Sequence, residues 1–422
     1  MTLPTGRPVG PGRGPEGASR AGAAAPPGTW TATGPLPRPG FWGQPADAAV
    51  LLDDGRVVLA GGEDGRRTPT AATAVYDPAV GAWSAPEPMW TPRRLHTVTL
   101  LDDGRVLAVG GIARSPDGPA EGLATAEVFD PAAGRWTPTG GLLQARFSHS
   151  ATRLPDGRVL VAGGATARPG PSPYTLRTAE LYDPVTGQWT QARPMTDARF
   201  GHPAVPLDDG RVLMVGGVLA AGRGHYGALG YCETYDPDSG GWTPVGTLTS
   251  ARKGHQATLL PDGGVLVTGG DMRGFRPDDW AFDPYSQWVT ERFDPGTGTW
   301  SPDTDMPWGR SHHRAVLLRS GEVLVVGGTD DVSLAVGYQN AMVYAPGTRT
   351  WSTEFGTVEG RWAPAAVALH DGRALAIGGL TRSGPAAPVL GEDEVTATTE
   401  IYTPANLTRE EADDASGRDG RG

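Results

Sequence analysis

The chain has 422 residues, a formal net charge of −11 and a sequence pI near 5.2, and Lys253 is its single lysine. This composition excludes the basic surface that binding to nucleic acid or to an anionic membrane requires. No apolar run reaches the length of a membrane span. Cys232 is the one cysteine, so an intrachain disulfide is impossible and a soluble, cytoplasmic protein is predicted.

The two ends of the chain differ from its middle in composition. Residues 1–28 are rich in Gly, Pro and Ala and contain no apolar stretch of signal-peptide length, so we predict a disordered leader. Residues 405–422 carry a run of charged and small residues and are predicted to form a disordered acidic tail. One domain is predicted between them, over residues 29–404.

A repeat fills this middle region. Seven Gly-Gly pairs recur at intervals of 49 to 58 residues, a period typical of propeller blades. After six of the pairs an aromatic residue, a proline and a tryptophan follow in fixed order, with seven residues from the aromatic residue to the tryptophan. The stretch from Arg146 to Trp189 is one complete unit. The pairs begin at Gly61, Gly110, Gly163, Gly216, Gly269, Gly327 and Gly378.

Each unit is predicted to form four short strands, named a to d in chain order. An Asp-Gly turn joins strands a and b in most units, strand b ends at the Gly-Gly pair, and strand d begins at the tryptophan. The seventh unit has no tryptophan after Tyr402, but Trp30 begins a strand of type d before the first unit. The ring is therefore predicted to close by combining a strand near Trp30 with strands a to c between Arg361 and Pro404, which hides the edge strands.

The repeated pattern, RxxH, DGRVLVxGG, ExYDP and a later Trp, resembles the kelch repeat of the galactose oxidase-like superfamily over roughly Thr29 to Pro404. This resemblance implies an all-β, seven-bladed propeller, and it implies no single activity. The copper-radical oxidases of the superfamily need a Tyr crosslinked to a Cys, with Tyr and His ligands. Here no Tyr precedes a strand-a His, and Cys232 lies just before a strand-c Glu, so such a copper centre is predicted to be absent.

Variation in length between the units is confined to two connections. The interval from the second Gly to the strand-c aromatic residue ranges from 14 to 23 residues, and the d–a connection before the first unit is longer than the others. Strand a runs away from the d–a connection and strand b returns, so the b–c connection opens on the same side. We therefore predict that this one face binds the ligand or partner.

Strand a carries an arginine in six units, and strand c carries a glutamate in five of those six. The first unit lacks both residues, and this joint presence or absence predicts a buried Arg–Glu pair within a blade. In the sixth unit Arg310 faces Met342, so either Arg310 binds an anionic ligand or a backbone carbonyl satisfies it. The predicted pairs are Arg93–Glu127, Arg146–Glu180, Arg199–Glu233, Arg252–Glu291 and Arg361–Glu400.

Five units carry a histidine three residues after the arginine. Two interpretations are open. As inner-strand histidines around one axis they resemble the metal ligands of galactose oxidase. As equivalent repeat residues they are hydrogen-bonded parts of the fold. No cofactor is predicted, and a transition metal at this histidine ring stays as the alternative. The five residues are His96, His149, His202, His255 and His313.

The units depart most from one another at the seam of blades 5, 6, 7 and 1, where we predict the site. His312 and His313 are the predicted catalytic residues, with His312 in acid/base chemistry near neutral pH. The arginines are predicted to hold anionic groups, and the tryptophans to form the walls. The predicted ligand-binding residues are Arg310, Arg314, Asp271, Arg273, Trp280, Trp42, Asp47, Trp362, Asp330 and Asp331.

Three functions are open from the sequence. The leading hypothesis is a propeller that holds a small polar or anionic organic molecule at its channel mouth and acts on it without a redox cofactor, as isomerases, cyclases or lyases of the family do. The second is a scaffold that binds a protein or an acidic peptide, as kelch substrate adaptors do. The third is a metal-dependent enzyme that uses the strand-a histidines. An enclosed cavity favours the first hypothesis, and a broad basin favours the second.

Overall fold

A computed structural model describes residues 28–42, 49–113, 121–166, 174–220, 226–271, 286–329, 336–354, 356–383, 386–389 and 392–407. Within these ranges no α-helix occurs, and therefore none long and apolar enough to cross a membrane. The predicted leader, except for Gly28, and the predicted tail from residue 408 onward lie outside these ranges.

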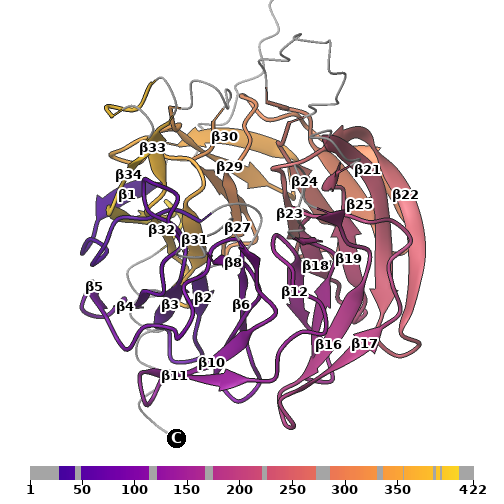
Figure 1. The fold of residues 1–422 in the computed structure, drawn as a ribbon. Helices are drawn as coiled ribbons and strands as arrows, with labels where there is room; N and C mark the ends of the chain where they lie inside the picture. The colour runs from indigo at the N-terminus through magenta and orange to yellow at the C-terminus, as the bar shows by residue number, and fades with distance from the viewer. Residues whose placement is uncertain are drawn as a thin grey trace, which may run out of the picture.

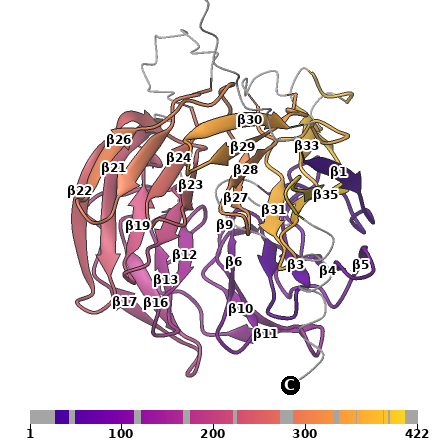
Figure 2. The same ribbon diagram turned by 180° about the vertical axis from the view of Figure 1, so that it is seen from behind.

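Seven antiparallel sheets surround a central axis (Figures 1 and 2). The strand-a segments of adjacent blades contact one another all the way around the ring, so strand a is the innermost strand. Strands b, c and d follow outward within each blade. The prediction of an all-β, seven-bladed propeller is confirmed.

Blades 1 to 4 each contain strands a to d in chain order. Blade 1 comprises β2 (Ala49–Leu51), β3 (Val57–Ala60), β4 (Thr73–Asp77) and β5 (Ala82–Ser84). Blade 2 comprises β6 (Thr97–Leu100), β7 (Val106–Val109), β10 (Ala126–Asp130) and β11 (Arg135–Thr139). Blade 3 comprises β12 (Ser150–Arg153), β13 (Val159–Ala162), β16 (Ala179–Asp183) and β17 (Gln188–Ala192). Blade 4 comprises β18 (Ala204–Pro206), β19 (Val212–Val215), β21 (Tyr226–Asp236) and β22 (Gly241–Arg252).

Blades 5 and 6 repeat this order, and blade 7 combines both ends of the chain. Blade 5 comprises β23 (Gln256–Leu259), β24 (Val265–Thr268), β25 (Glu291–Asp294) and β26 (Thr299–Pro302). Blade 6 comprises β27 (Arg314–Leu317), β28 (Val323–Val326), β29 (Ala341–Ala345) and β30 (Thr350–Glu354). Blade 7 comprises β31 (Ala365–Ala368), β32 (Ala374–Ile377), β35 (Thr399–Thr403) and β1 (Thr29–Ala32).

The ring closes as predicted, through the N-terminal strand. β1 pairs antiparallel with β35, so that Trp30 lies opposite Tyr402 with ring centroids 5.2 Å apart. The backbone nitrogen of Gly28 donates to Glu354 Oε2 at 2.6 Å, which also ties the start of this strand to blade 6. Since β1 covers the outer edge of β35, blade 7 has the same four strands as its neighbours.

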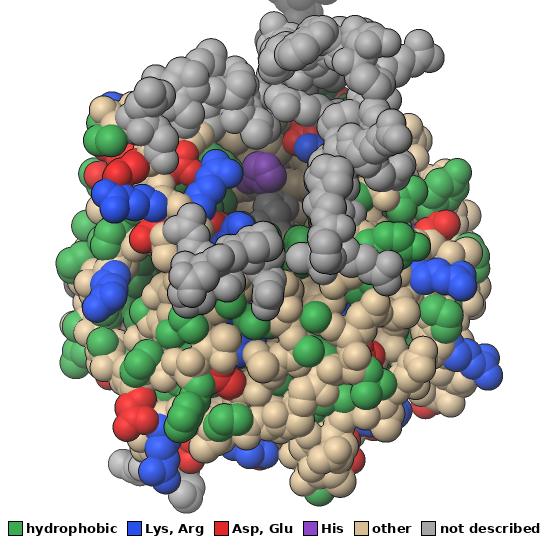
Figure 3. Space-filling model, viewed as in Figure 1, with side chains coloured by type: hydrophobic (Ala, Val, Ile, Leu, Met, Phe, Trp, Pro, Cys, Tyr) green, Lys and Arg blue, Asp and Glu red, His purple; other side chains and the backbone are tan. Residues whose placement is uncertain are grey.

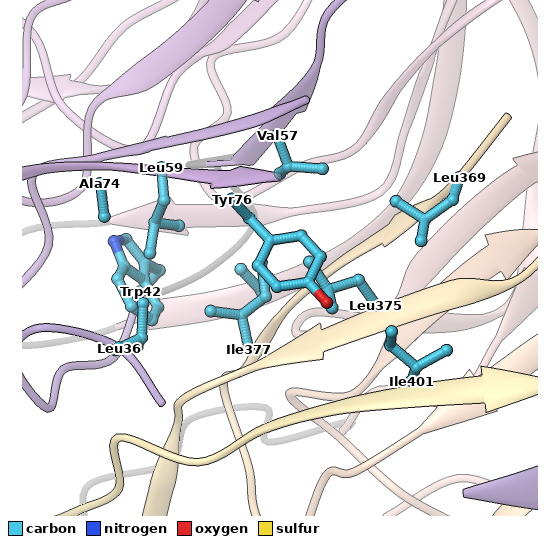
Figure 4. Close-up of a cluster of buried hydrophobic side chains, with 11 residues drawn as sticks. Leu36, Trp42, Val57, Leu59, Ala74, Tyr76, Leu369, Leu375, Ile377 and Ile401 are labelled. Carbon is cyan, nitrogen blue, oxygen red and sulfur yellow. The ribbon is translucent and has the colours of Figure 1, made fainter. Parts of the chain in front are cut away.

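The hydrophobic core lies between blades rather than within them. Seven clusters of buried side chains fill the seven seams of the ring. Figure 4 shows the cluster at the seam of blades 7 and 1, where Leu59 and Tyr76 of blade 1 meet Leu375 and Ile377 of blade 7. Each blade is thus stabilised by burial against its two neighbours.

The Gly-Gly pairs are required by close contact between blades. Gly163 and Gly164 both have positive φ, at 63° and 92°. A Cβ at Gly163 would lie 2.5 Å from the carbonyl oxygen of Arg199 and 2.9 Å from the ring of His202. No side chain fits at this seam, which explains why the pair recurs in every unit.

Candidate functional site

The d–a and b–c connections lie on one side of the ring, here named the loop face, and the a–b and c–d turns lie on the opposite face. On the loop face, short antiparallel ribbons extend the b–c connections of blades 2, 3, 4 and 7. They are β8 (Ile112–Ala113) with β9 (Glu121–Gly122), β14 (Ala165–Thr166) with β15 (Tyr174–Thr175), β20 (Val218–Ala220) with the start of β21, and β33 (Leu380–Arg382) with β34 (Glu394–Val395). The variable connections therefore build a rim on one face only.

Buried Arg–Glu pairs anchor the connections of the loop face. All five predicted pairs are formed, with N–O distances of 2.6–3.0 Å in blades 2 to 5. In blade 3, Arg146 Nη1 also donates to the carbonyls of Gly163 and Thr178, at 2.8 and 2.9 Å. Glu180 accepts a hydrogen bond from the backbone nitrogen of Leu143 at 2.6 Å. Each pair thus joins strand b, the b–c connection and the d–a connection.

Blade 6 satisfies its arginine without a glutamate. Arg310 Nη1 donates to the carbonyls of Gly327 and Asn340, at 2.8 and 3.1 Å, and Nη2 donates to Asn340 Oδ1 at 2.8 Å. Met342 is buried at the glutamate position, and the guanidinium lies over the ring of Tyr338, 5.0 Å from its centroid. Burial lowers the pKa of Arg310 to about 10, so this side chain stays a cation at neutral pH. The predicted backbone carbonyl contact is confirmed, and the anionic ligand stays a prediction.

Blade 1 lacks the arginine and uses Trp42 in its place. Trp42 Nε1 donates to the carbonyl of Gly61 at 3.1 Å, and the equivalent carbonyl of Gly110 accepts from Arg93 in blade 2. The indole is buried in the core between blades 7 and 1 (Figure 4). The role of Trp42 as a ligand wall stays a prediction, but its N–H group is already bonded to the protein.

The five strand-a histidines form a buried ring. Three of them contact hydroxyl groups across a blade seam through Nε2: His149 with Thr97 at 3.0 Å, His202 with Ser150 at 3.1 Å, and His313 with Thr268 at 2.9 Å. Burial, followed by the charge of the strand-a arginine, lowers the pKa of His96 and His255 to about 3. Among the described residues, no group of three or more His, Cys, Asp or Glu side chains is placed to hold a metal ion. A metal at this ring stays an untested prediction.

These buried histidines predict a loss of stability in acid. A folded-state pKa of about 3, below the ordinary value of 6.5, means that the unfolded chain binds more protons. The contribution of each buried histidine to the free energy of unfolding is therefore fully present above pH 6.5. It decreases as the pH falls from 6.5 toward 3, by about 1.4 kcal/mol per pH unit for each histidine. We expect Tm to be constant from about pH 8 to 7 and to drop steeply by about pH 5.

Thermal unfolding followed by circular dichroism across this pH range tests that expectation. The exposed His370 on the opposite face provides the control, because His370→Gln removes a histidine outside the buried ring. The slope of Tm against pH should be unchanged in this variant. A Tm that does not depend on pH between 8 and 5 would contradict the burial of neutral histidines.

Comparison with known proteins agrees with this architecture. The Kelch motif family matches residues 146–196. The chain is a kelch-repeat propeller. Kelch-like protein 34 of Homo sapiens is 28% identical over 229 residues, which cover 54% of this chain and 32% of that protein. Kelch-like protein terF of Aspergillus terreus (strain NIH 2624 / FGSC A1156) is 29% identical over 146 residues, which cover 33% of this chain and 31% of that protein. The chain spans about a third of the length of these relatives.

Two solved structures have the same fold as this kelch propeller. A fungal alcohol oxidase of the AA5 family, in complex with copper, matches with a TM-score of 0.66 and 19% identity, over 89% of this chain and 76% of the oxidase. YjhT matches with a TM-score of 0.57 and 15% identity, over 76% of this chain and 99% of YjhT. At these identities the likeness establishes the galactose oxidase-like propeller fold and no activity.

Three of the predicted site residues lie close together in the kelch propeller. The ring centroids of His312 and Trp362 are 5.5 Å apart. Asp271 forms an ion pair with Lys253, with Nζ and Oδ1 3.0 Å apart, and its charge acts on His312. Burial, opposed by Asp271, lowers the pKa of His312 to about 4. The imidazole is therefore neutral at pH 7 and suited to accept a proton rather than to donate one.

Three further predicted site residues are buried parts of the blades. His313 and Arg310 are fully buried at repeat positions. Arg314 is also buried, and its Nε donates to the carbonyl of Pro364 at 2.9 Å, which joins blades 6 and 7. Five predicted residues lie outside the described ranges: Asp47, Arg273, Trp280, Asp330 and Asp331.

A cavity of about 570 Å³ opens beside blade 1 and is lined in part by Arg38, Trp42 and Glu63. Glu63 is buried, and its Oε2 lies 3.1 Å from Arg94 Nη1. Burial raises the pKa of Glu63, and the charge of Arg94 opposes this shift. Glu63 is not among the site residues predicted from the sequence. The available signal was a glutamate directly after a Gly-Gly pair, where most other units have an apolar residue or Thr.

The innermost strands line a small cavity near the axis of the propeller. A cavity of about 90 Å³ lies there, lined by residues such as Thr97, Ser150 and Gln256. This volume is well below the roughly 300–1,000 Å³ of sites for drug-sized ligands. Seen from the side of Figure 1, the surface is hollowed near its centre, with a histidine side chain visible beside acidic and basic side chains (Figure 3).

Exposed apolar side chains are concentrated on the loop face. Among the described residues, twelve large apolar side chains are exposed, and only Val80 and Val185 lie in turns of the opposite face. Trp90, Trp288 and Trp308 are 73%, 50% and 44% exposed. The ten residues on the loop face are Trp90, Leu143, Tyr174, Leu219, Tyr231, Trp288, Trp308, Val336, Val358 and Val389.

Trp90 shows that the fold does not require this exposure. Its backbone nitrogen donates to Glu127 Oε2 at 2.7 Å, and Thr196 and Thr249 make the same contact in later blades. A threonine at this position therefore makes the same backbone hydrogen bond, and the repeat does not need an indole side chain here. It borders a groove of about 320 Å³. Trp90 is not among the site residues predicted from the sequence, because it lies outside both the strand-a motif and the variable b–c connections.

Proposed function

We propose that the loop face of this kelch propeller binds a segment of another protein, in the cytoplasmic setting that a single, buried cysteine favours. The observation that carries this proposal is the concentration of ten exposed apolar side chains on the loop face, against two on the other. Contiguous exposed apolar surface marks protein interaction sites, and Trp is enriched among the residues that contribute most to binding. The resemblance of the repeat to kelch substrate adaptors supports the same function.

Hydrogen bonds of the backbone fix the connections that carry these side chains, as expected for a binding surface. The d–a connection that carries Trp90 is fixed by two hydrogen bonds to Glu127, from the nitrogens of Trp90 at 2.7 Å and Thr91 at 3.1 Å. The connection that carries Trp308 is fixed by a 2.9 Å hydrogen bond from Met306 to Trp288. Anchors held in this way lose little conformational entropy on binding.

Peptides selected from a random display library against the full chain test this proposal. We expect the affinity of selected peptides to fall at least about tenfold, or about 1.4 kcal/mol, in the Trp90→Thr/Trp308→Gln variant. Both replacements are residues that the repeat itself carries at these positions, as in Thr196 and Gln144, so the fold should be preserved.

The matched control is Val80→Thr/Val185→Thr, which removes the two exposed apolar side chains of the opposite face. This variant should bind the selected peptides as the unmodified chain does. Equal binding by all three proteins, or loss of binding only in the control variant, would exclude the loop face as the binding surface.

A second candidate function is acid/base chemistry on a small organic molecule, of the isomerase, cyclase or lyase type. Glu63 favours it, because a buried carboxyl group with a raised pKa beside a cavity of about 570 Å³ is typical of a general acid or base. Thermal-shift screening with small polar metabolites tests this function. Stabilisation of the unmodified chain that is lost in Glu63→Gln supports it, and equal stabilisation of both proteins argues against it.

A further inference from the structure

Blade 1 lacks both members of the buried Arg–Glu pair, and Ala74 stands at the position of the glutamate. In blade 2 the glutamate of the pair, Glu127, accepts hydrogen bonds from the backbone nitrogens of Trp90 and Thr91, at 2.7 and 3.1 Å. The residue of blade 1 that corresponds to Trp90 is Pro37, which has no N–H group. Blade 1 therefore lacks the cation, the carboxylate and one of the N–H groups that fill this part of blade 2.

The missing pair leaves a deeper cavity in blade 1. Each residue that lines the groove of about 320 Å³ in blade 2 has a counterpart, 53 positions earlier, that lines the cavity of about 570 Å³ in blade 1. The cavity of blade 1 also reaches Gly61 and Glu63, which follow β3. Gly61 corresponds to Gly110, whose carbonyl accepts a hydrogen bond from Arg93 at 2.8 Å in blade 2. The inner end of the cavity thus lies where the other blade holds its arginine.

A buried carboxyl group lines this cavity. Glu63 is only 3% exposed, and its Oε2 lies 3.1 Å from Arg94 Nη1. Its Oε1 makes no hydrogen bond to the described residues, so this oxygen is free to accept one from a ligand. The fold does not require a carboxyl group here, because Ala165 and Val218 make the same backbone bridge in blades 3 and 4.

The walls of the cavity offer many hydrogen-bond acceptors and few donors. The N–H groups of Gly61, Glu63 and Thr70 already donate to backbone carbonyls, and the indole N–H of Trp42 donates to the carbonyl of Gly61. Proline has a carbonyl group but no N–H group. A ligand that fits these walls must therefore supply the donors. The prolines that line the cavity are Pro37, Pro39, Pro69, Pro86 and Pro88.

The charges around the cavity offset one another. Glu63 pairs with Arg94, and Arg67, whose charge also acts on Glu63, pairs with Asp393 at 2.9 Å. The donor that binds Glu63 is therefore selected by the carboxyl oxygen itself, and a hydrogen bond from a cation to a carboxylate is about twice as strong as one from a neutral group. The exposed charged residues of the lining are one cation and one anion, Arg38 and Asp64.

We propose that the cavity of blade 1 binds the ammonium or guanidinium group of a ligand, with Glu63 Oε1 as its main acceptor. The apolar part of the ligand packs against Leu59, Ala71 and Ala74, of which Leu59 and Ala74 lie near Trp42 (Figure 4). The cation belongs either to a small organic amine or to a Lys or Arg side chain of the bound protein segment. In the first case the inference names the ligand class of the second candidate function, and in the second case it rests on the proposed function.

Saturation-transfer NMR titration of the full chain tests this proposal. The small probes are butylammonium and butylguanidinium, with butanol as the neutral counterpart. The peptide probes are capped Gly-Lys-Gly and Gly-Arg-Gly, with capped Gly-norleucine-Gly as the neutral counterpart. Two variants alter the site: Glu63→Gln removes the charge of the acceptor, and Ala71→Trp fills the cavity.

The repeat itself shows that a tryptophan is compatible with the fold at this position. The carbonyls of Ala71 in blade 1 and Trp288 in blade 5 accept equivalent hydrogen bonds, from the nitrogens of Met89 and Met306, both at 2.9 Å. The matched control is Ala124→Trp, which makes the same change at the equivalent position of blade 2 and fills the groove there instead.

We expect the cationic probes to bind the unmodified chain at least about tenfold, or about 1.4 kcal/mol, more tightly than their neutral counterparts. Their affinity should fall by a similar factor in Glu63→Gln and in Ala71→Trp, and it should stay the same in Ala124→Trp. Small cations that bind at least as tightly as the peptides identify a free amine as the ligand. Tighter binding of the peptides identifies a side chain of a protein segment.

Three results would overturn the proposal: no binding of any cationic probe, equal binding of the neutral counterparts, or unchanged affinity in both Glu63→Gln and Ala71→Trp. The proposed function fails or holds separately, because Trp90 and Trp308 do not line this cavity. Stabilisation by an uncharged or anionic metabolite that is lost in Glu63→Gln would keep the second candidate function and reject the cation site.

Discussion

Deletion of residues 1–33 is expected to abolish the cooperative folding of the propeller. This deletion removes β1, which supplies the outer strand of blade 7, pairs with β35 and packs Trp30 against the seam of blades 6 and 7. Loss of a fully buried aromatic side chain costs about 3–5 kcal/mol; Trp30 is partly buried, so its own loss costs less, and the lost pairing of β1 with β35 adds to it. It also exposes the edge of β35, which favours aggregation. Circular dichroism and size-exclusion chromatography of residues 34–422 measure both effects.

Deletion of residues 1–27 is the control for this experiment, because it leaves β1 and its hydrogen bond from Gly28 to Glu354 in place. The Tm of this shorter deletion should match that of the full chain. If residues 34–422 also unfolded cooperatively at the temperature of the full chain, closure of the ring by β1 would not contribute to stability.

The second large effect is expected from Arg146→Met. This change leaves Glu180 buried without its cation and also removes the hydrogen bonds from Arg146 to the carbonyls of Gly163 and Thr178. Breaking one partner of a buried ion pair costs about 3–5 kcal/mol of the free energy of unfolding. Urea unfolding gives this value from the shift of the midpoint.

Arg158→Met in the same blade is the matched control. Arg158 pairs with Asp156, but both side chains are partly exposed, at 37% and 43%, so its loss should cost less than about 1 kcal/mol. Equal costs for Arg146→Met and Arg158→Met would show that the buried pairs do not hold the connections of the loop face.

The repeat made most of the fold predictable. The distances between the marker residues of a unit recur in seven copies. The blade boundaries and the closure of the ring by Trp30 could therefore be predicted from the sequence. The Arg–Glu pairs were predictable because both residues are missing together in the first unit. The residues that replace a missing member of a pair were not predictable. In these blades a side chain from a different position along the chain makes the hydrogen bond of the missing residue. Trp42 donates to Gly61 in place of an arginine, and Asn340 replaces a glutamate that would lie at Met342.

The candidate site was less predictable than the fold. Sequence comparison between units indicated the seam of blades 5, 6, 7 and 1, and His312 and Trp362 do lie in contact there. The cavity at Glu63 depends on the packing of blade 1, which residue spacing does not describe. The exposure of Trp90 and Trp308 also depends on packing, since the same chain buries Trp136 and Trp189 in its seams.

The central claim is that side chains departing from the repeat on the loop face form a protein-binding surface. Hydrogen–deuterium exchange of the full chain, alone and bound to a library-selected peptide, tests it most directly. The predicted result is slower exchange in the d–a connections over residues 88–93 and 303–310, with no change in the c–d turns over residues 77–81 and 183–187. Slower exchange confined to those turns, with none in the d–a connections, would contradict the claim.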